Sequence, residues 1–68
     1  MKVILYTIDC QTCKVLEKKL EYAGIEFTRV SDTETIKMKG FGNQVFPILE
    51  VDGLVMNYKT AIQWIKNQ

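Results

Sequence analysis

Two cysteines separated by two residues lie where an apolar run gives way to an amphipathic segment. Before them, residues 2–7 are rich in Val, Ile, Leu and Tyr, which predicts a strand buried on both faces. After them, residues 11–23 carry apolar side chains at helical spacing, and Gly24 follows as a C-terminal cap. Cys10 and Cys13 are therefore expected at the turn from the first strand into the first helix.

The rest of the chain divides at turn residues and helix caps. Ser31 followed by Glu34 has the spacing of a capping box, Asp52-Gly53 is a strong hairpin signal, and Asn57 is a candidate N-cap. The expected elements are a strand over 25–30, a short helix from Ser31 to about Lys39, strands over 45–51 and 54–56, and a helix over about 58–67.

This order predicts an α/β fold of the type β-α-β-α-β-β-α, with one mixed four-stranded sheet and three helices on its two faces. The first three elements form a βαβ unit, so the first two strands are expected to be parallel with a right-handed crossover. Sixty-eight residues without a linker or repeat predict one domain over residues 1–68.

Composition excludes several classes of function. Without histidine, the chain has no His-based triad and no His ligand for zinc. A formal charge of +1 argues against nucleic acid or a membrane surface as the partner, and no apolar run approaches the roughly 20 residues of a membrane span. The amino-terminal segment does not read as a signal peptide, so a cytoplasmic location is expected. Reactive or metal-binding cysteines are more common there than a permanent disulfide.

The two cysteines differ in their expected environment. A thiol at a helix N-terminus faces unpaired N–H groups and the positive end of the helix dipole, which favour the nucleophilic thiolate. Cys10 has this position, whereas Cys13 lies on the apolar stripe that also contains Leu16, Leu20 and Ala23. We therefore assign both as catalytic residues: Cys10 attacks a target disulfide, and Cys13 then displaces the target.

Neighbouring charges and two other cysteine chemistries leave alternatives open. Asp9 opposes formation of the Cys10 thiolate and Lys14 favours it, so the sign of the net effect is not fixed by the sequence. A zinc site would have only two of its four ligands unless two copies shared one ion, and an inert disulfide does not suit a reducing compartment. The thiol mechanism requires no metal and no bound cofactor.

Pro47 is the second informative residue because proline early in a buried strand removes a ladder donor. The more ordinary explanation is a trans proline at a strand edge or start. The other is a cis Phe46–Pro47 bond that leaves the Phe46 backbone exposed beside the cysteines, where an extended substrate could pair with it as an added strand. Phe46 and Pro47 are therefore the predicted substrate-binding residues.

Taken together, these segments resemble the glutaredoxin-like redoxins of the thioredoxin-fold superfamily, and most of all the short redoxins that serve ribonucleotide reductase. The similarity rests on Cys10-Gln11-Thr12-Cys13, Phe46-Pro47 and Val51-Asp52-Gly53, and it extends from Val3 to Lys66. It implies a thioredoxin-like fold, a cis proline against the cysteines and a nucleophilic first cysteine.

Two elements that hold glutathione in glutaredoxins are missing. The stretch that often contributes a lysine is Thr7-Ile8-Asp9 here, and Met56-Asn57-Tyr58-Lys59 replaces the usual Gly-Gly-x-Asp turn. Electrons are therefore expected from NADPH through thioredoxin reductase, with glutathione as the less favoured donor. The Ser-Gly-Phe turn typical of the ribonucleotide-reductase redoxins is also absent, so the sequence secures neither subtype.

The sequence thus predicts a small monomeric dithiol–disulfide oxidoreductase that carries electrons to disulfides in proteins. Ribonucleotide reductase is the target that the resemblance implies. Two alternatives remain: a glutathione-dependent glutaredoxin, and a non-catalytic binding module built on the same fold.

Overall fold

The computed structural model describes residues 1–42 and 44–68. Its element order is the predicted β-α-β-α-β-β-α. The elements are β1 (Val3–Tyr6), α1 (Gln11–Tyr22), β2 (Thr28–Val30), α2 (Thr33–Met38), β3 (Ile48–Val51), β4 (Leu54–Met56) and α3 (Tyr58–Lys66). None of the helices in the described part of the chain is long and apolar enough to span a bilayer.

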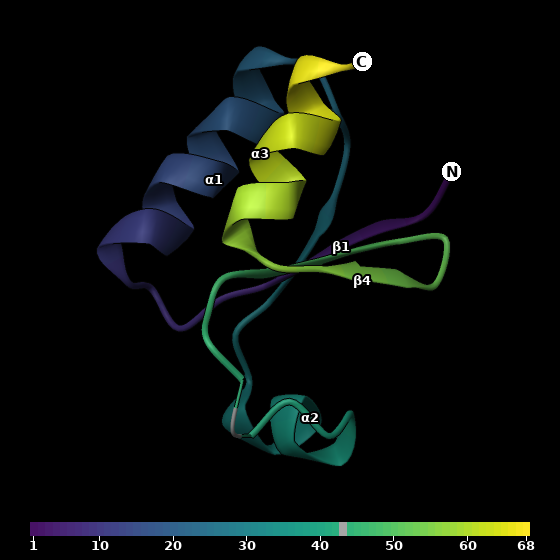
Figure 1. The fold of residues 1–68 in the computed structure, drawn as a ribbon. Coiled ribbons are helices and arrows are strands. Elements are labelled where there is room, and N and C mark those ends of the chain that lie inside the picture. The colour runs from purple at the N-terminus through teal and green to yellow at the C-terminus, as the bar shows by residue number, and fades with distance from the viewer. Residues whose placement is uncertain (43) are drawn as a thin grey trace.

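The four strands form one mixed sheet in the order β2-β1-β3-β4. β1 is parallel to β2 and antiparallel to β3, and β4 is antiparallel to β3. In Figure 1, α1 and α3 lie side by side on one face of this sheet, while α2 lies on the other. The predicted parallel βαβ unit, the antiparallel hairpin and the helices on two faces are all confirmed.

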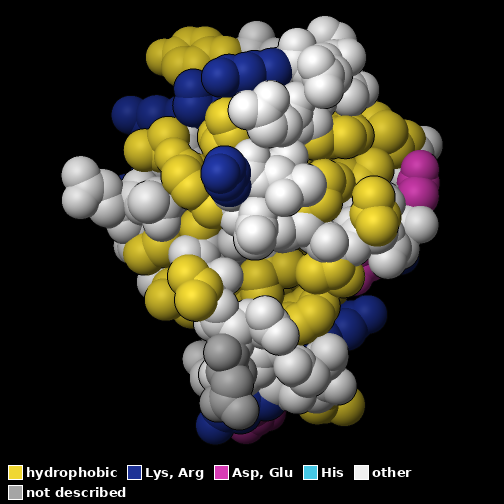
Figure 2. Space-filling view, viewed as in Figure 1, with side chains coloured by type: hydrophobic (Ala, Val, Ile, Leu, Met, Phe, Trp, Pro, Cys, Tyr) yellow, Lys and Arg dark blue, Asp and Glu magenta, His cyan; other side chains and the backbone are white. Residues whose placement is uncertain are grey.

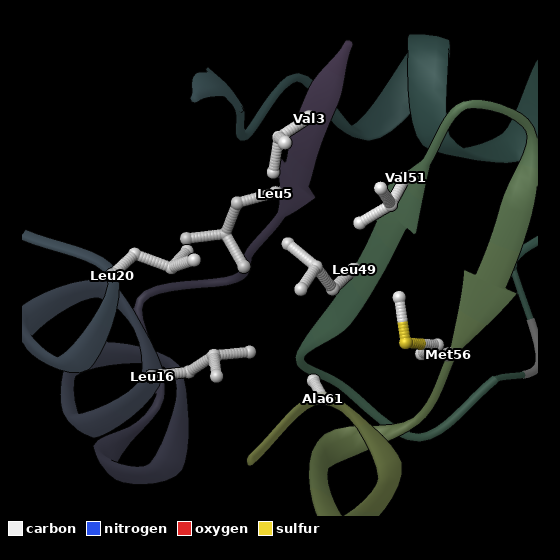
Figure 3. Packing of buried hydrophobic residues seen from close by; sticks show 8 residues of the cluster. All are labelled: Val3, Leu5, Leu16, Leu20, Leu49, Val51, Met56 and Ala61. Atoms are coloured by element: carbon white, nitrogen blue, oxygen red, sulfur yellow. The ribbon is translucent and has the colours of Figure 1, made fainter. Parts of the chain in front are cut away.

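The larger part of the core lies between the sheet and the pair α1 and α3 (Figure 3). It consists of Val3, Leu5, Leu16, Leu20, Leu49, Val51, Met56 and Ala61. Leu5 and Leu49 are opposite each other in the β1–β3 register, and Leu16 and Leu20 are one helical turn apart on α1. Full burial of each such side chain contributes about 1.5–3 kcal/mol to folding.

A smaller cluster lies on the face that α2 covers. Its buried residues are Tyr6, Ile36 and Ile48, and Phe41 and Phe46 pack against them while partly exposed. The rings of Tyr6 and Phe41 meet edge to face, with centroids 5.0 Å apart and planes at 73°. With only six residues, α2 contributes a single buried side chain, Ile36.

The hairpin between β3 and β4 turns at Asp52 and Gly53, as predicted. Both residues have positive φ angles, 49° and 88°, which a two-residue turn of this hand requires. Asp52 also closes the start of β1, since its carboxylate accepts from the Lys2 N–H at 2.7 Å and its own N–H donates to the Lys2 carbonyl at 2.9 Å. The turn therefore holds the beginning of the central strand.

Two predictions about helix ends differ in outcome. Asn57 caps α3 as expected, because its Oδ1 accepts from the Thr60 N–H at 2.8 Å. The Ser31–Glu34 capping box is wrong: Asp32 is the N-cap of α2, and it accepts from the Thr35 hydroxyl at 2.7 Å. The hydrogen bond to Thr35 holds the pKa of the Asp32 carboxyl below its usual value.

Several predicted boundaries were too wide. The strand expected over 25–30 pairs only from Thr28 to Val30, although Ile25 and Phe27 before it still pack against the larger core. The strand expected over 45–51 begins at Ile48, so Pro47 precedes the ladder instead of interrupting it. Ladder pairing, which the alternation of side chains does not reveal, sets these limits.

The remaining boundaries differ by one or two residues at their ends; α2 begins at Thr33, two residues after the predicted start at Ser31. β1 covers Val3–Tyr6 within the predicted 2–7, and its Ile4 is only partly buried. Helix α1 ends at Tyr22, so Ala23 is its C-cap and is exposed, in contrast to the predicted place on the buried stripe. Helix α3 ends at Lys66, and Asn67 is its C-cap.

Candidate active site

Cys10 is the N-cap of α1. Its backbone is extended, and its Sγ accepts a hydrogen bond from the Cys13 N–H at 3.1 Å, one of the donors that a helix leaves unpaired in its first turn. The Cys10 carbonyl accepts the first helical hydrogen bond, from the Lys14 N–H at 3.0 Å. The Cys10 sulfur is thus held at the helix N-terminus, where the sequence predicts it.

Cys10 and Cys13 are joined by a disulfide bond, with their Cα atoms 4.9 Å apart. This separation lies within the range that a disulfide bridges without backbone movement. Cys10 is partly exposed, whereas Cys13 is only 1% exposed and lies on the buried stripe of α1. An incoming molecule therefore reaches the first sulfur and not the second.

Two polar oxygens lie near the exposed sulfur. The Thr12 hydroxyl is 3.3 Å from Cys10 Sγ, and the Phe46 carbonyl oxygen is 4.0 Å from it. Thr12 has no site role among the sequence predictions, because a residue between two cysteines has no periodic signal. A hydroxyl at this distance can donate to a thiolate, which would favour the charged form of Cys10.

The segment before β3 brings a second part of the chain to the disulfide. The Phe46–Pro47 peptide bond is cis, as the resemblance implies, and Pro47 is among the most completely buried residues. Phe46 remains partly exposed, with its carbonyl directed toward Cys10. The structure therefore brings the Phe46 carbonyl near Cys10, with Pro47 next in the chain, and the substrate-binding role of both residues stays a prediction.

A groove of about 280 Å³ adjoins this segment on the α2 side. Its lining is Ile8, Thr33, Ile36, Lys37, Gly42, Gln44 and Phe46. Phe46 is common to the groove and to the surroundings of the disulfide, and Ile8 belongs to the turn that leads to Cys10. A second hollow of about 330 Å³ lies beside Met1 and Phe27, at the end of β1 away from the cysteines.

Arg29 connects the cysteine turn to α1 through two ion pairs. Its guanidinium pairs with the Asp9 carboxylate, and its Nε lies 3.0 Å from Glu17 Oε1. The sequence suggests Lys14 as the cation near Asp9, whereas Arg29, 20 residues away in the chain, has no local signal that links it to Asp9. The parallel register that places Arg29 beside Leu5 could have drawn attention to it.

The segment from Met56 to Lys59 has a structural role. Met56 is buried in the larger core, and the Asn57 side chain caps α3. Within residues 1–42 and 44–68, no group of three or more cysteine or acidic side chains converges as metal ligands would.

Figure 2 shows how the surface is divided on one face of the molecule. Lys and Arg side chains gather at the end where α1 and α3 lie, while hydrophobic side chains are exposed across the middle. The exposed large hydrophobic residues of the described chain are Met1, Ile8, Val15, Tyr22, Met38, Val45, Leu54 and Val55. Of these, Ile8 and Val45 flank the two segments that meet at the disulfide.

Comparison with solved structures identifies the fold. The whole chain superimposes on 36% of the glutathione S-transferase from Ascaris lumbricoides, with a TM-score of 0.73 and 24% sequence identity. No protein-family model and no curated protein matches the sequence. The chain thus has the α/β thioredoxin-like fold, with a Cys-x-x-Cys disulfide at the start of its first helix. It spans little more than a third of the transferase chain.

Proposed function

We propose that this chain is a thiol–disulfide oxidoreductase that carries electrons to disulfides in proteins. The observation that carries this proposal is the inequality of the two sulfurs at the N-terminus of α1: one is accessible, and the other is buried within bonding reach. A disulfide with a purely structural role has no need of an accessible sulfur that accepts helix N–H donors.

The reaction begins from the reduced pair. The Cys10 thiolate attacks one sulfur of the target disulfide, forming a mixed disulfide and releasing the other target sulfur as a thiolate, which takes up a proton. Cys13, after losing its proton, attacks Cys10 Sγ; the Cys10–Cys13 bond forms and the mixed disulfide breaks. Two electrons have moved to the target, which leaves with two thiols, and the chain is left in the disulfide form.

A protein target is supported by the surface beside the sulfurs. The Phe46 carbonyl lies at the edge of the disulfide and offers a hydrogen-bond acceptor to the backbone of an extended segment. The adjoining groove is lined by apolar groups of Ile8, Ile36 and Phe46, with Lys37 at its side. We infer that it accepts an apolar side chain near the target cysteine. Ribonucleotide reductase is the target that the family resemblance favours.

The proposed electron donor is NADPH acting through a flavoprotein thioredoxin reductase. Two stretches that hold glutathione in glutaredoxins have other residues here, and Asn57 within one of them is engaged in capping α3. No cofactor bound by the chain itself enters the proposed cycle.

Single cysteine variants test the proposed cycle. Cys10→Ser is expected to abolish reduction of a protein disulfide such as that of insulin. Cys13→Ser is expected to retain the first step and to accumulate a covalent mixed disulfide, which mass spectrometry detects and a reductant releases. Full reductase activity in Cys10→Ser would overturn the mechanism, and retained biological activity without reductase activity would favour the binding-module alternative.

The donor is tested separately with the oxidised wild-type chain. One reaction supplies thioredoxin reductase with NADPH, and the other supplies glutathione with glutathione reductase and NADPH. Faster consumption of NADPH in the first is the expected result. Rapid turnover with glutathione alone would overturn this part of the proposal and would identify the chain as a glutathione-dependent glutaredoxin.

A further inference from the structure

We propose that Arg29 is a positioning residue for Cys10: by pairing with the adjacent Asp9 carboxylate, it offsets the negative charge that opposes the Cys10 thiolate. This inference rests on the proposed function, since it concerns the reactivity of the attacking thiol. It also accounts for an unfavourable charge in the sequence: the Asp9 carboxylate immediately precedes Cys10, the residue that must ionise.

The location of Arg29 on β2 explains how its side chain reaches the Asp9 carboxylate. Arg29 is the middle residue of β2 and is in register with Leu5 of β1, whose side chain faces α1. From this strand its guanidinium lies between the β1–α1 turn and α1, pairing with Asp9 and with Glu17. The Arg29 guanidinium thus connects β2 to the β1–α1 turn and to α1.

Two hydrogen bonds also hold the backbone of the turn that carries Asp9. The Thr7 N–H donates to the Val30 carbonyl at 3.0 Å, and the buried Thr7 hydroxyl accepts from the Asp9 N–H at 3.0 Å. Asp9 itself has a φ of 60°, a conformation that non-glycine residues adopt uncommonly. These hydrogen bonds fix the backbone of the turn without Arg29, so the uncompensated charge of Asp9 is the main quantity that changes when Arg29 is replaced.

Charge counting gives the direction of the effect. The charged side chains around Cys10 are Asp9, Lys14, Glu17, Arg29 and, at the groove on the α2 side, Lys37. Loss of Arg29 leaves Asp9 and Glu17 without their shared partner and so disfavours the Cys10 thiolate. The ion pairs are partly exposed and solvent screens them. One unit charge roughly 7 Å away in water changes an ionisation equilibrium about threefold.

Alkylation of Cys10 by iodoacetamide tests this inference without any redox partner. The measurements use the full chain carrying Cys13→Ser, so that one thiol reacts, and they follow the rate as a function of pH. Adding Arg29→Gln is expected to slow alkylation about threefold on the acidic side of the profile. The rate at the alkaline plateau, where Cys10 is fully ionised, is expected to stay the same.

Two further variants separate charge from structure. The double change Asp9→Asn with Arg29→Gln is expected to return the acidic-side rate to near that of the parent, because the carboxylate that Arg29 neutralises is gone. Lys66→Gln removes one positive charge from the last turn of α3 and is expected to change nothing. High salt is expected to shrink the effect of Arg29→Gln, since it screens exposed charges.

Three results would overturn the inference. They are an equal loss of rate at every pH in Arg29→Gln, no recovery in the double variant, or an unchanged profile. Circular dichroism of each variant shows whether it is folded, and Arg29→Lys, which keeps the charge, is expected to retain most of the parent's acidic-side rate. If alkylation follows the expected pattern but wild-type protein reduces no protein disulfide, the proposed function fails while the role of Arg29 in tuning the thiol stands.

Discussion

The two faces of the sheet are covered very differently. On one face, the larger core between the sheet and α1 and α3 has eight buried residues; on the other, the smaller cluster has three, one of which belongs to the six-residue α2. The candidate active site combines residues from both faces. Cys13 belongs to the buried stripe of α1, whereas Phe46 and the groove belong to the thinly covered face.

This difference separates two requirements of the proposed reaction. The sulfur pair needs a fixed geometry, which the helix with the most buried side chains provides. The surface that meets a target benefits from segments that few contacts restrain, and such segments open at low free energy. We therefore expect the α1–α3 face to determine the stability of the molecule and the α2 face to determine what it accepts.

The largest expected effect is on the free energy of unfolding, and it compares truncation of Leu16 with truncation of Ile36. Leu16→Ala, in α1, is expected to lower the free energy of unfolding by about 3–5 kcal/mol, and Ile36→Ala, in α2, by about 2 kcal/mol, since a cavity under a short surface helix can partly collapse. Urea unfolding followed by circular dichroism measures both values. Val15→Ala, at a partly exposed position of α1, is the control and should cost less than about 1 kcal/mol.

An Ile36→Ala cost equal to or above that of Leu16→Ala would break the comparison between the faces. For a domain of this size the total free energy of unfolding is only about 3–10 kcal/mol. Leu16→Ala is therefore expected to remove a third or more of the total stability, and a loss below about 1 kcal/mol would contradict the prediction.

An effect of intermediate size is a loss of stability at alkaline pH, and we expect it from Tyr6 in the smaller cluster. Burial raises the pKa of the Tyr6 hydroxyl, and the negative charge of Glu50 raises it further. Because the folded-state pKa lies above that of the unfolded chain, this contribution to stability is complete below about pH 10 and is lost as the pH rises through the folded-state pKa. Urea unfolding measured at several alkaline pH values should show the decline.

Two Tyr→Phe variants show which tyrosine causes the loss of stability at alkaline pH. Tyr6→Phe should remove much of it, while Tyr22→Phe, at a position 89% exposed, should leave it in place. The same alkaline loss in Tyr6→Phe and in the wild type would show that Tyr6 is not its source.

The smallest effects concern the N-caps on the two faces. Asn57→Ala is expected to lower the free energy of unfolding by about 1 kcal/mol at any pH, because an amide oxygen does not titrate. The Asp32 cap is different: its pKa is lowered in the fold, so its contribution is present above the unfolded-state pKa and is lost as the pH falls through the folded-state value.

Thermal unfolding from neutral to acidic pH compares the two caps. Asp32→Asn should flatten part of the acid dependence, and Asn57→Ala should shift the whole curve without changing its slope. An unchanged acid slope in Asp32→Asn would remove Asp32 as a pH-sensitive cap.

Local patterns in the sequence were sufficient for the order of the elements. Helical spacing defined α1 to within one residue, and Asp52-Gly53 defined the hairpin because the turn accepts few other residues. The position of the cysteines at the start of α1 followed from the same patterns. These features depend on neighbours in the chain, which is why they could be predicted.

Features that depend on distant partners were missed or misplaced. The ends of β2 and β3 are set by ladder pairing with β1, and the choice of Asp32 over the adjacent Ser31 as N-cap is a shift of one residue between two suitable side chains. The ion pair between Asp9 and Arg29 requires the β1–β2 register and a side-chain direction. A sequence pattern contains neither.

The burial of Cys13 also governs how long a captured partner would remain attached. In the proposed cycle, a sulfur that solvent hardly reaches has one neighbour to attack, the Cys10 sulfur in the mixed disulfide. Detachment by Cys13 is then a unimolecular event, whose rate does not depend on the concentration of the chain or of its target. Release of the target by this intramolecular attack would have the same rate in a dilute solution as in a concentrated one.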